Sequence, residues 1–139
     1  MGRQIKNEQE LFDAIQQLPG VDARLVDMVQ FDLSQQFEII ATQTEVLIGM
    51  HGAALTFAVY LPPQGAVVEA WPKTVDMWRC FEHLTSYAGL FYSRWENPDP
   101  SKFMIDESGD YTTIDVDAFV IRVKEAIDHV KRKRKTIFG

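Results

Sequence analysis

Residues 45–61, EVLIGMHGAALTFAVYL, decide the fold of this chain. Residues 46–48 are an unbroken apolar run, which is typical of a strand covered on both faces of a sheet. Residues 49–52, Gly-Met-His-Gly, interrupt that run with two glycines, and residues 53–61 are apolar except for Thr56. The stretch therefore predicts a buried strand, a tight turn and a buried helix, which together open a βα unit.

A glycine turn at a helix start is suited to binding phosphate. The first backbone N–H groups of a helix have no partner within it and carry the positive end of its dipole. Gly49 and Gly52 would let a phosphate approach these groups, because glycine has no Cβ. His51 would add a hydrogen-bond donor. Alternatively, the turn only reverses the chain and His51 is an ordinary structural histidine; the spacing matches neither the G-x-G-x-x-G nor the Walker pattern.

The composition indicates a globular chain. The 139 residues are 46% hydrophobic and 12% aromatic, which suffices for one domain with a core. No apolar run reaches the roughly 18 residues of a membrane span, and the N-terminus lacks the apolar core of a secretory signal. Cys80 is the only cysteine, so no internal disulfide can form.

The net charge of −6 conceals an asymmetry. Residues 131–135, KRKRK, hold five of the 14 basic residues, so the rest of the chain is strongly acidic. An acidic body argues against nucleic-acid binding, which needs a broad basic surface. The basic run is typical of a solvated helix end, where cations also favour the C-terminal dipole.

Strands and helices alternate along the chain. We expect helices near residues 7–18, 34–41, 53–61, 75–87 and 116–130, and strands at 23–29, 46–48, 66–71 and 90–95. Asn7 with Glu10 has the spacing of a capping box, and Ser34 is suited to cap the second helix. Residues 96–114 are polar and are expected to form a surface loop. This alternation predicts an α/β domain with a mostly parallel, Rossmann-like sheet flanked by helices.

The order of these elements contains one anomaly. A Rossmann-like unit normally opens with a strand, whereas nothing before Asn7 has the pattern of a buried strand. We therefore expect the sheet to lack its first strand and the chain to be a piece of a longer protein. A strand edge left unpaired in this way would invite self-association.

Ligands bind beyond the carboxyl ends of the strands in a parallel α/β sheet. By that rule we expect a ligand to lie near the turn at residues 49–52, Glu69 and Arg94. Glu69 is suited to hold ribose or sugar hydroxyls, and the equal alternative is a strand-end carboxylate exposed to water. Arg3 and Arg94 are suited to balance phosphate charge by forked hydrogen bonds, although a plain surface role is favoured for Arg94.

Other kinds of chemistry find no support in the sequence. His51, His83 and His129 are scattered, so no metal-binding spacing appears, and no Gly-x-Ser-x-Gly elbow is present. Residues 115–117, Asp-Val-Asp, lie at an expected helix start, where carboxylates act as caps. Cys80 is expected to be inert packing.

Several segments resemble, in the same order, those of the family 61 glycosyltransferases. The central match is EVLIGMHGAALT at residues 45–56, followed by YLP at 60–62 and VVE at 67–69. RQIKNEQEL at residues 3–11 is similar to the family's Arg-x-Ile-x-Asn segment, and YSRW at 92–95 is similar to its Tyr-x-x-Trp strand.

This resemblance implies the C-terminal, Rossmann-like half of a two-domain GT-B fold, here a single domain over residues 1–139. It implies transfer of a sugar, with inversion, from a nucleotide sugar such as a UDP-sugar to a protein or glycan acceptor in the ER or Golgi. Backbone N–H donors would stabilise the departing UDP without a metal, and no cofactor is expected beyond the donor. The implied donor-binding residues are Gly49, His51, Gly52, Ala53, Glu69 and Arg3.

The chain departs from the family pattern in two ways. Ala54 stands where relatives place another glycine, which narrows the loop. The sequence also lacks the N-terminal domain, where the acceptor site and general base are expected. No catalytic residue is therefore assigned, and the isolated chain is expected to be inactive. Two alternatives are a non-catalytic interaction domain derived from this fold and an unrelated α/β nucleotide-binding enzyme.

Overall fold

The structure, a computed structural model, describes residues 2–72 and 78–138, without the side chains of residues 2, 3, 53 and 134–138. The strands in this part are β1 (Gly2–Ile5), β2 (Val46–Met50), β3 (Ala66–Trp71), β4 (Phe91–Glu96), β5 (Phe103–Asp106) and β6 (Gly109–Thr112). The α-helices are α1 (Glu8–Gln16), α2 (Leu33–Gln43), α3 (Cys80–Tyr87) and α4 (Val116–Phe138). The 3-10 helices are η1 (Met28–Gln30), η2 (Ala53–Tyr60) and η3 (Pro100–Lys102).

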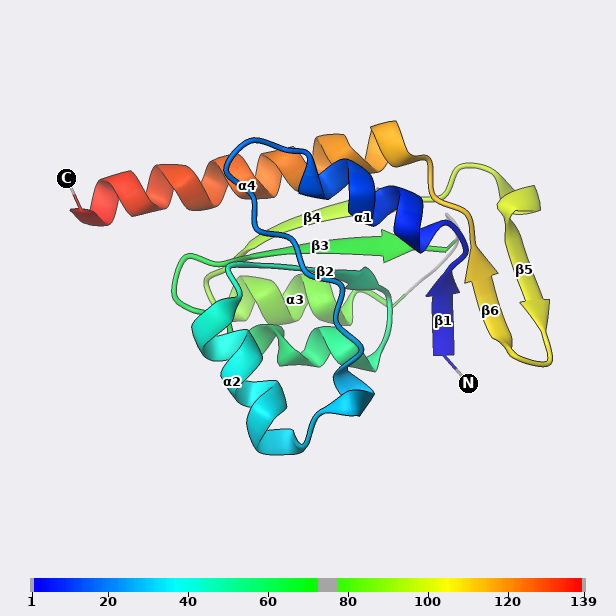
Figure 1. Cartoon of the computed structure of the whole chain (residues 1–139), viewed down its shortest axis with the longest axis horizontal. Coiled ribbons are helices and arrows are strands. Elements are labelled where there is room, and N and C mark those ends of the chain that lie inside the picture. Colours follow the sequence, from blue (N-terminus) through cyan, green and yellow to red (C-terminus); the bar gives the residue numbers. More distant parts are fainter. Residues whose placement is uncertain (1, 73–77, 139) are drawn as a thin grey trace.

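A parallel sheet in the order β2-β3-β4 is the centre of the fold. Helices α1 and α4 cover one face of this sheet, and η2, α2 and α3 lie on the other (Figure 1). Every residue of β3 is buried. Its alternate side chains divide between two cores, with Val68 packed toward Phe119 on one face and Val67 toward Leu55 on the other. The predicted α/β class and the predicted strands 46–48, 66–71 and 90–95 are thus confirmed.

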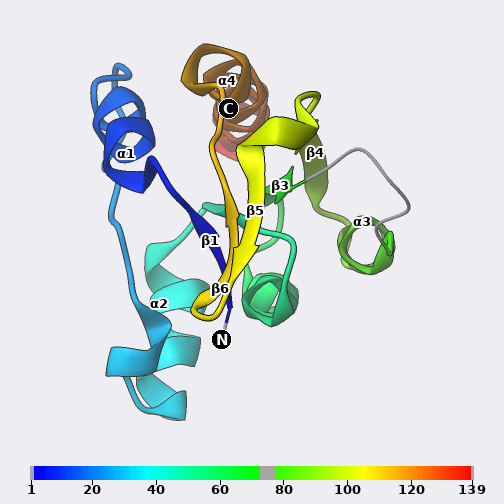
Figure 2. The same ribbon diagram turned by 90° about the vertical axis from the view of Figure 1, so that its right-hand side faces the viewer.

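A second sheet stands at the end of the first (Figures 1 and 2). Strand β1 pairs in parallel with β6, and β6 pairs antiparallel with β5. The predicted surface loop at residues 96–114 is therefore wrong. Strand β1 does precede Asn7, but it belongs to this second sheet and its Gln4 is exposed, so it is not a buried strand of the parallel sheet. The hairpin turn between β5 and β6 is held by Asp106, whose carboxylate accepts from Ser108 N at 2.7 Å, and Gly109 has a φ of 141°.

The strand expected at residues 23–29 is also wrong. The chain there has no regular structure until the 3-10 helix η1. Leu25 is 52% exposed and Val26 is 37% exposed. An apolar, β-branched run forms a strand only where a neighbouring strand takes its hydrogen bonds, and none is found for it in the described ranges. The absence of a first strand from the parallel sheet stays a prediction.

The apolar residues 53–61 form the 3-10 helix η2, where the sequence predicted a helix of unspecified type. Leu55, Ala58 and Leu61 are all buried. Their spacing of three residues matches a helix with three residues per turn, so all three side chains face the sheet. This spacing explains why the segment winds more tightly than an α-helix.

The caps of the other helices agree only in part with those predicted from the sequence. Helix α2 is capped by Asp32, through a capping box with Gln35, and not by Ser34 as expected. Asp115 accepts from Ala118 N at 3.1 Å, which confirms its predicted capping role at the start of α4. The expected start of the helix at residues 75–87 lies partly outside the described residues, and α3 begins at Cys80.

Asn7 links the segment before α1 to the segment that leads into α4. It precedes α1, but its side chain makes no capping bond to that helix. Its amide instead donates to Ile114 O at 2.8 Å, and its carbonyl oxygen accepts from Ile114 N at 2.9 Å. The predicted capping box of Asn7 and Glu10 is therefore wrong, and the two residues meet only through their side chains, with Asn7 Nδ2 donating to Glu10 Oε2 at 3.2 Å. Asn7 thus fixes the start of α1 beside the start of α4.

Replacing Asn7 with alanine should lower the free energy of unfolding by about 1 to 3 kcal/mol, because two part-buried backbone groups of Ile114 lose their partners. Urea denaturation measures this change. Gln9→Ala is a matched control, since it removes only an exposed bond to Asp13, and it should alter stability little. Equal losses in both variants would contradict the assigned role of Asn7.

Candidate functional site

The glycine turn follows β2 at the carboxyl end of the parallel sheet. A Cβ on Gly49 would lie 3.1 Å from Leu55 Cδ2, so this glycine lets η2 pack closely on β2. The backbone N–H of His51 donates to Ala70 O at 2.9 Å, which extends the pairing with β3 beyond the strand. Gly52 is extended, with φ 169° and ψ 172°. A side chain at residue 49 would therefore press on Leu55, whereas backbone strain does not require glycine at residue 52.

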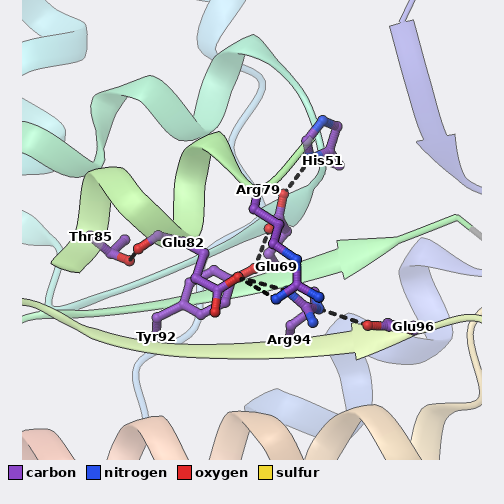
Figure 3. A network of polar contacts seen from close by, with 8 residues as sticks. All are labelled: His51, Glu69, Arg79, Glu82, Thr85, Tyr92, Arg94 and Glu96. Carbon is purple, nitrogen blue, oxygen red and sulfur yellow. Dashed lines mark hydrogen bonds and ion pairs between the residues drawn. The ribbon is translucent and has the colours of Figure 1, made fainter. Parts of the chain in front are cut away.

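The His51 side chain turns inward and meets Glu69 on β3 (Figure 3). Its Nδ1 lies 2.6 Å from Glu69 Oε2, and the His51 side chain is only 9% exposed. Two aromatic rings stand edge-on to it, Trp71 at 6.2 Å and Phe81 at 5.1 Å between ring centroids. The imidazole is therefore part of a buried polar contact and not an open tip of the turn.

Glu69 accepts hydrogen bonds at both of its carboxylate oxygens. Oε2 faces His51, and Oε1 accepts from the hydroxyl of Tyr92 on β4. Glu69 is 0% exposed, so the alternative of a carboxylate open to water is wrong. Burial, and then the bond to Glu69, raise the pKa of Tyr92, which keeps its hydroxyl protonated as a donor. A ribose or sugar contact for Glu69 stays a prediction.

Arg94 lies on the same face of β4 as Tyr92, two residues further along the strand. Its Nε donates to Glu96 at 2.9 Å and its Nη1 to Glu82 at 3.1 Å, where Glu82 belongs to α3. The guanidinium carbon lies 4.0 Å above the ring of Trp71, and the side chain is 18% exposed. Arg94 is therefore clamped and not a plain surface residue, which corrects the role favoured from the sequence.

A surface depression of about 420 Å³ lies beside this clamp. Its lining residues are Glu82, Tyr92, Arg94, Trp95, Glu96 and Arg122. The contacts of Tyr92 with Glu69, and of Glu82 and Glu96 with Arg94, were not predicted from the sequence. The alternation along β4 contained a signal for Tyr92, because residues two apart on a strand share a face.

The structure brings four of the six predicted donor-binding residues together. Gly49, His51 and Gly52 lie on or after β2, and Glu69 lies opposite Gly49 on β3. Ala53 begins η2 directly after the turn, and its side chain lies outside the description. The backbone of Arg3 pairs with Asp110 in the second sheet, but its side chain, and so its predicted role, also lies outside the described residues.

The remaining expectations concern metals, thiols and membranes. No group of three metal-binding side chains is found in the described part of the chain. Burial, and then the nearby Glu69, raise the pKa of the Cys80 thiol, which makes it a poor nucleophile, as expected. None of the helices in residues 2–72 and 78–138 is both long and apolar enough to span a bilayer.

The family model described as Glycosyltransferase 61 matches residues 1–68 of the chain, a range that includes the glycine turn. The resemblance to family 61 is confirmed. The EGF domain-specific O-linked N-acetylglucosamine transferase of Rattus norvegicus is 31% identical over 140 residues, which cover 92% of this chain and 26% of that protein. The protein of the same name from Canis lupus familiaris is 29% identical over 148 residues, covering 98% of this chain and 27% of its own length.

A third relative comes from an insect. The Drosophila melanogaster protein of that name is 31% identical over 97 residues, covering 70% of this chain and 18% of that protein. The chain thus spans about a quarter or less of the length of these relatives. The matches to the rat and dog proteins extend well beyond residue 68, because they cover nearly the whole chain.

Arg94→Lys should lower the free energy of unfolding by about 1 to 2 kcal/mol, because lysine loses both the fork to two carboxylates and the stacking on Trp71. Chemical denaturation measures the difference. Arg122→Lys is the matched control, since the Arg122 side chain is 46% exposed and contacts only Glu125 among the ion pairs of the described residues. The control should change stability little, and a loss as large as that of Arg94→Lys would contradict the clamp.

Proposed function

We propose that the chain is the donor-binding half of an inverting glycosyltransferase that uses a nucleotide sugar, a UDP-sugar above all. One observation carries the proposal: a glycine turn at the carboxyl end of a parallel strand lies within the segment matched by the glycosyltransferase family 61 model. Ligands in open parallel sheets bind at this end. In this proposal residues 1–139 form a single domain of a larger, two-domain enzyme of the GT-B type.

The donor diphosphate is proposed to contact the backbone of the turn. Gly52 presents an open approach, because a Cβ built on it would first meet Met50 O, at 3.8 Å, among the described atoms. Glycine at this position therefore leaves room for a ligand and is not demanded by the fold. Because His51 is 7% exposed, the N–H groups of Gly52 and Ala53 would make the main contacts, with the imidazole beside them. Arg3 and Glu69 complete the proposed donor-binding set, Glu69 through its contact with His51.

The proposed chemistry needs little from this half beyond electrostatics. The bond from the sugar's anomeric carbon to UDP breaks as an acceptor oxygen attacks from the opposite side, and negative charge grows on the departing diphosphate. Preorganised N–H donors stabilise that charge without reorganising during the reaction. The base that takes the acceptor's proton would belong to another domain. We therefore propose that the isolated chain binds the donor but transfers nothing, and that the whole enzyme works in the secretory pathway on a protein or glycan acceptor.

A second candidate is a non-catalytic interaction domain. Among the described strands, β2 pairs only with β3, so no described strand takes the hydrogen bonds of its other edge. Leu25, Val26 and Val29 are also exposed apolar side chains in the segment that precedes α2. Open strand edges and apolar surface favour association. A stable dimer in light scattering, together with no nucleotide binding, would favour this candidate over the transferase half.

Titration of UDP into the wild-type chain by calorimetry tests the proposed function, and Gly52→Val locates the site. Valine fits the extended backbone at residue 52, so the variant should keep its stability. Its side chain would occupy the proposed approach to the turn, and UDP affinity should fall at least about tenfold, a loss of about 1.4 kcal/mol.

Ala41→Val is the matched control for this titration. It adds the same side chain at an exposed position of α2, away from the turn. Its UDP affinity should equal that of the wild type. Equal affinities for Gly52→Val and Ala41→Val would contradict the assignment of the turn, and no binding by the wild type would contradict the donor-binding function.

A further inference from the structure

The fully buried carboxylate of Glu69 needs an explanation beyond stability. Its neighbours on the same face of β3, Val67 and Trp71, fill the core beneath η2 and α3. A buried carboxylate with its hydrogen-bond partners seldom stabilises a fold more than apolar side chains of similar size, because the polar groups lose their hydration. An apolar residue at position 69 would therefore serve the core at least as well. The carboxylate is better explained by what its two oxygens hold.

Those oxygens link three adjacent strands in one polar chain (Figure 3). Tyr92 of β4 donates to Glu69 of β3, and Glu69 in turn lies 2.6 Å from Nδ1 of His51, just beyond β2. While Glu69 is ionised its oxygens only accept hydrogen bonds, and Nδ1 of the imidazole then carries the proton. The pair thus fixes both the angle of the ring and the nitrogen that is protonated.

The polar chain ends at the glycine turn. The backbone N–H of His51 is held by Ala70 O at 2.9 Å, and its side chain is held by Glu69, so both are anchored on β3. The next residue is Gly52, whose freedom of rotation is the largest of any residue type. Anchoring His51 at two points therefore limits how far the N–H groups that follow it can turn away from the sheet edge.

We propose that Glu69 and Tyr92 are positioning residues, which hold the His51 imidazole and thereby fix the orientation in which the turn at residues 49–53 meets a diphosphate. This inference rests on the proposed donor-binding function and gives Glu69 a role through His51 in place of a direct sugar contact. Since Glu69 is 0% exposed and both oxygens accept from protein donors, the carboxylate acts without touching the ligand. Diphosphate is the ligand chemistry that the site would recognise.

Glu69→Gln and Tyr92→Phe test this role, because each keeps the shape of its side chain. Glutamine removes the charge, and phenylalanine removes the hydroxyl that donates to Glu69. Ser93→Ala is the matched control: Ser93 is a buried residue of β4 whose hydroxyl donates to Glu125 at 3.1 Å, away from His51. Two measurements are made on each variant, the affinity for UDP and the ring-nitrogen NMR signals of His51.

In Glu69→Gln the His51 ring signals should shift toward a mixture of protonation forms, and UDP affinity should fall about tenfold, as when one hydrogen bond to a charged group is lost. Tyr92→Phe should change both in the same direction, by less. Ser93→Ala should change neither. Unchanged ring signals in Glu69→Gln would overturn the positioning role, even if UDP binds.

The same experiment separates the two proposals. Shifted ring signals with unchanged UDP affinity would overturn the link between the polar chain and the diphosphate. Absence of UDP binding by the wild type would overturn the proposed donor-binding function itself. A loss of affinity in Ser93→Ala as large as that in Glu69→Gln would overturn the role of the polar chain, because it would reflect a general weakening of the strand.

Discussion

The pairing of a buried carboxylate with its two donors is the constraint on which this end of the molecule depends. Glu69 is 0% exposed and lies on β3, the central strand of the parallel sheet. A buried charge without a partner would be severely destabilising there. Tyr92 and His51 reach it from the two neighbouring strands, so the three strands must keep their register for the charge to be satisfied. The hydrogen bonds of Glu69 therefore depend on the register of the three strands, and they help to hold that register near the carboxyl ends of the strands.

Apolar packing positions this polar layer. The face of the sheet opposite Glu69 packs on Phe119 and Val123 of α4, while η2 and α3 close over the face that carries it. Because Leu55 of η2 packs closely on Gly49, the backbone is held in place where the turn begins. Phe81 of α3 then stands edge-on to the imidazole at 5.1 Å between centroids. The resemblance to family 61 concerns a segment that this packing holds in place.

Elements were predicted correctly from the sequence where the local residue pattern and the tertiary contacts favour the same structure. The apolar run at residues 46–48, the strand with Glu69 and the stripe of α4 were all found in this way. The hairpin at residues 103–112 was missed, because its strands have four residues each and β6, which is largely polar, pairs with β1, over a hundred positions away. The glycine turn was located correctly, but the inward direction of His51 was not, since only the register with β3 brings Glu69 within reach.

The pairing of β1 with β6 has a consequence for how the chain acquires its structure. Gly2 faces Gly109 and Ile5 faces Thr112, so the hydrogen bonds of β1 form only with a strand more than a hundred residues further along the chain. Contacts so distant in sequence slow folding, because a long loop must close before they form. The parallel core joins strands that lie closer together in the sequence and can therefore assemble first, whereas the small sheet, and the Asn7 bridge to Ile114 beside it, must bring together segments more than a hundred residues apart.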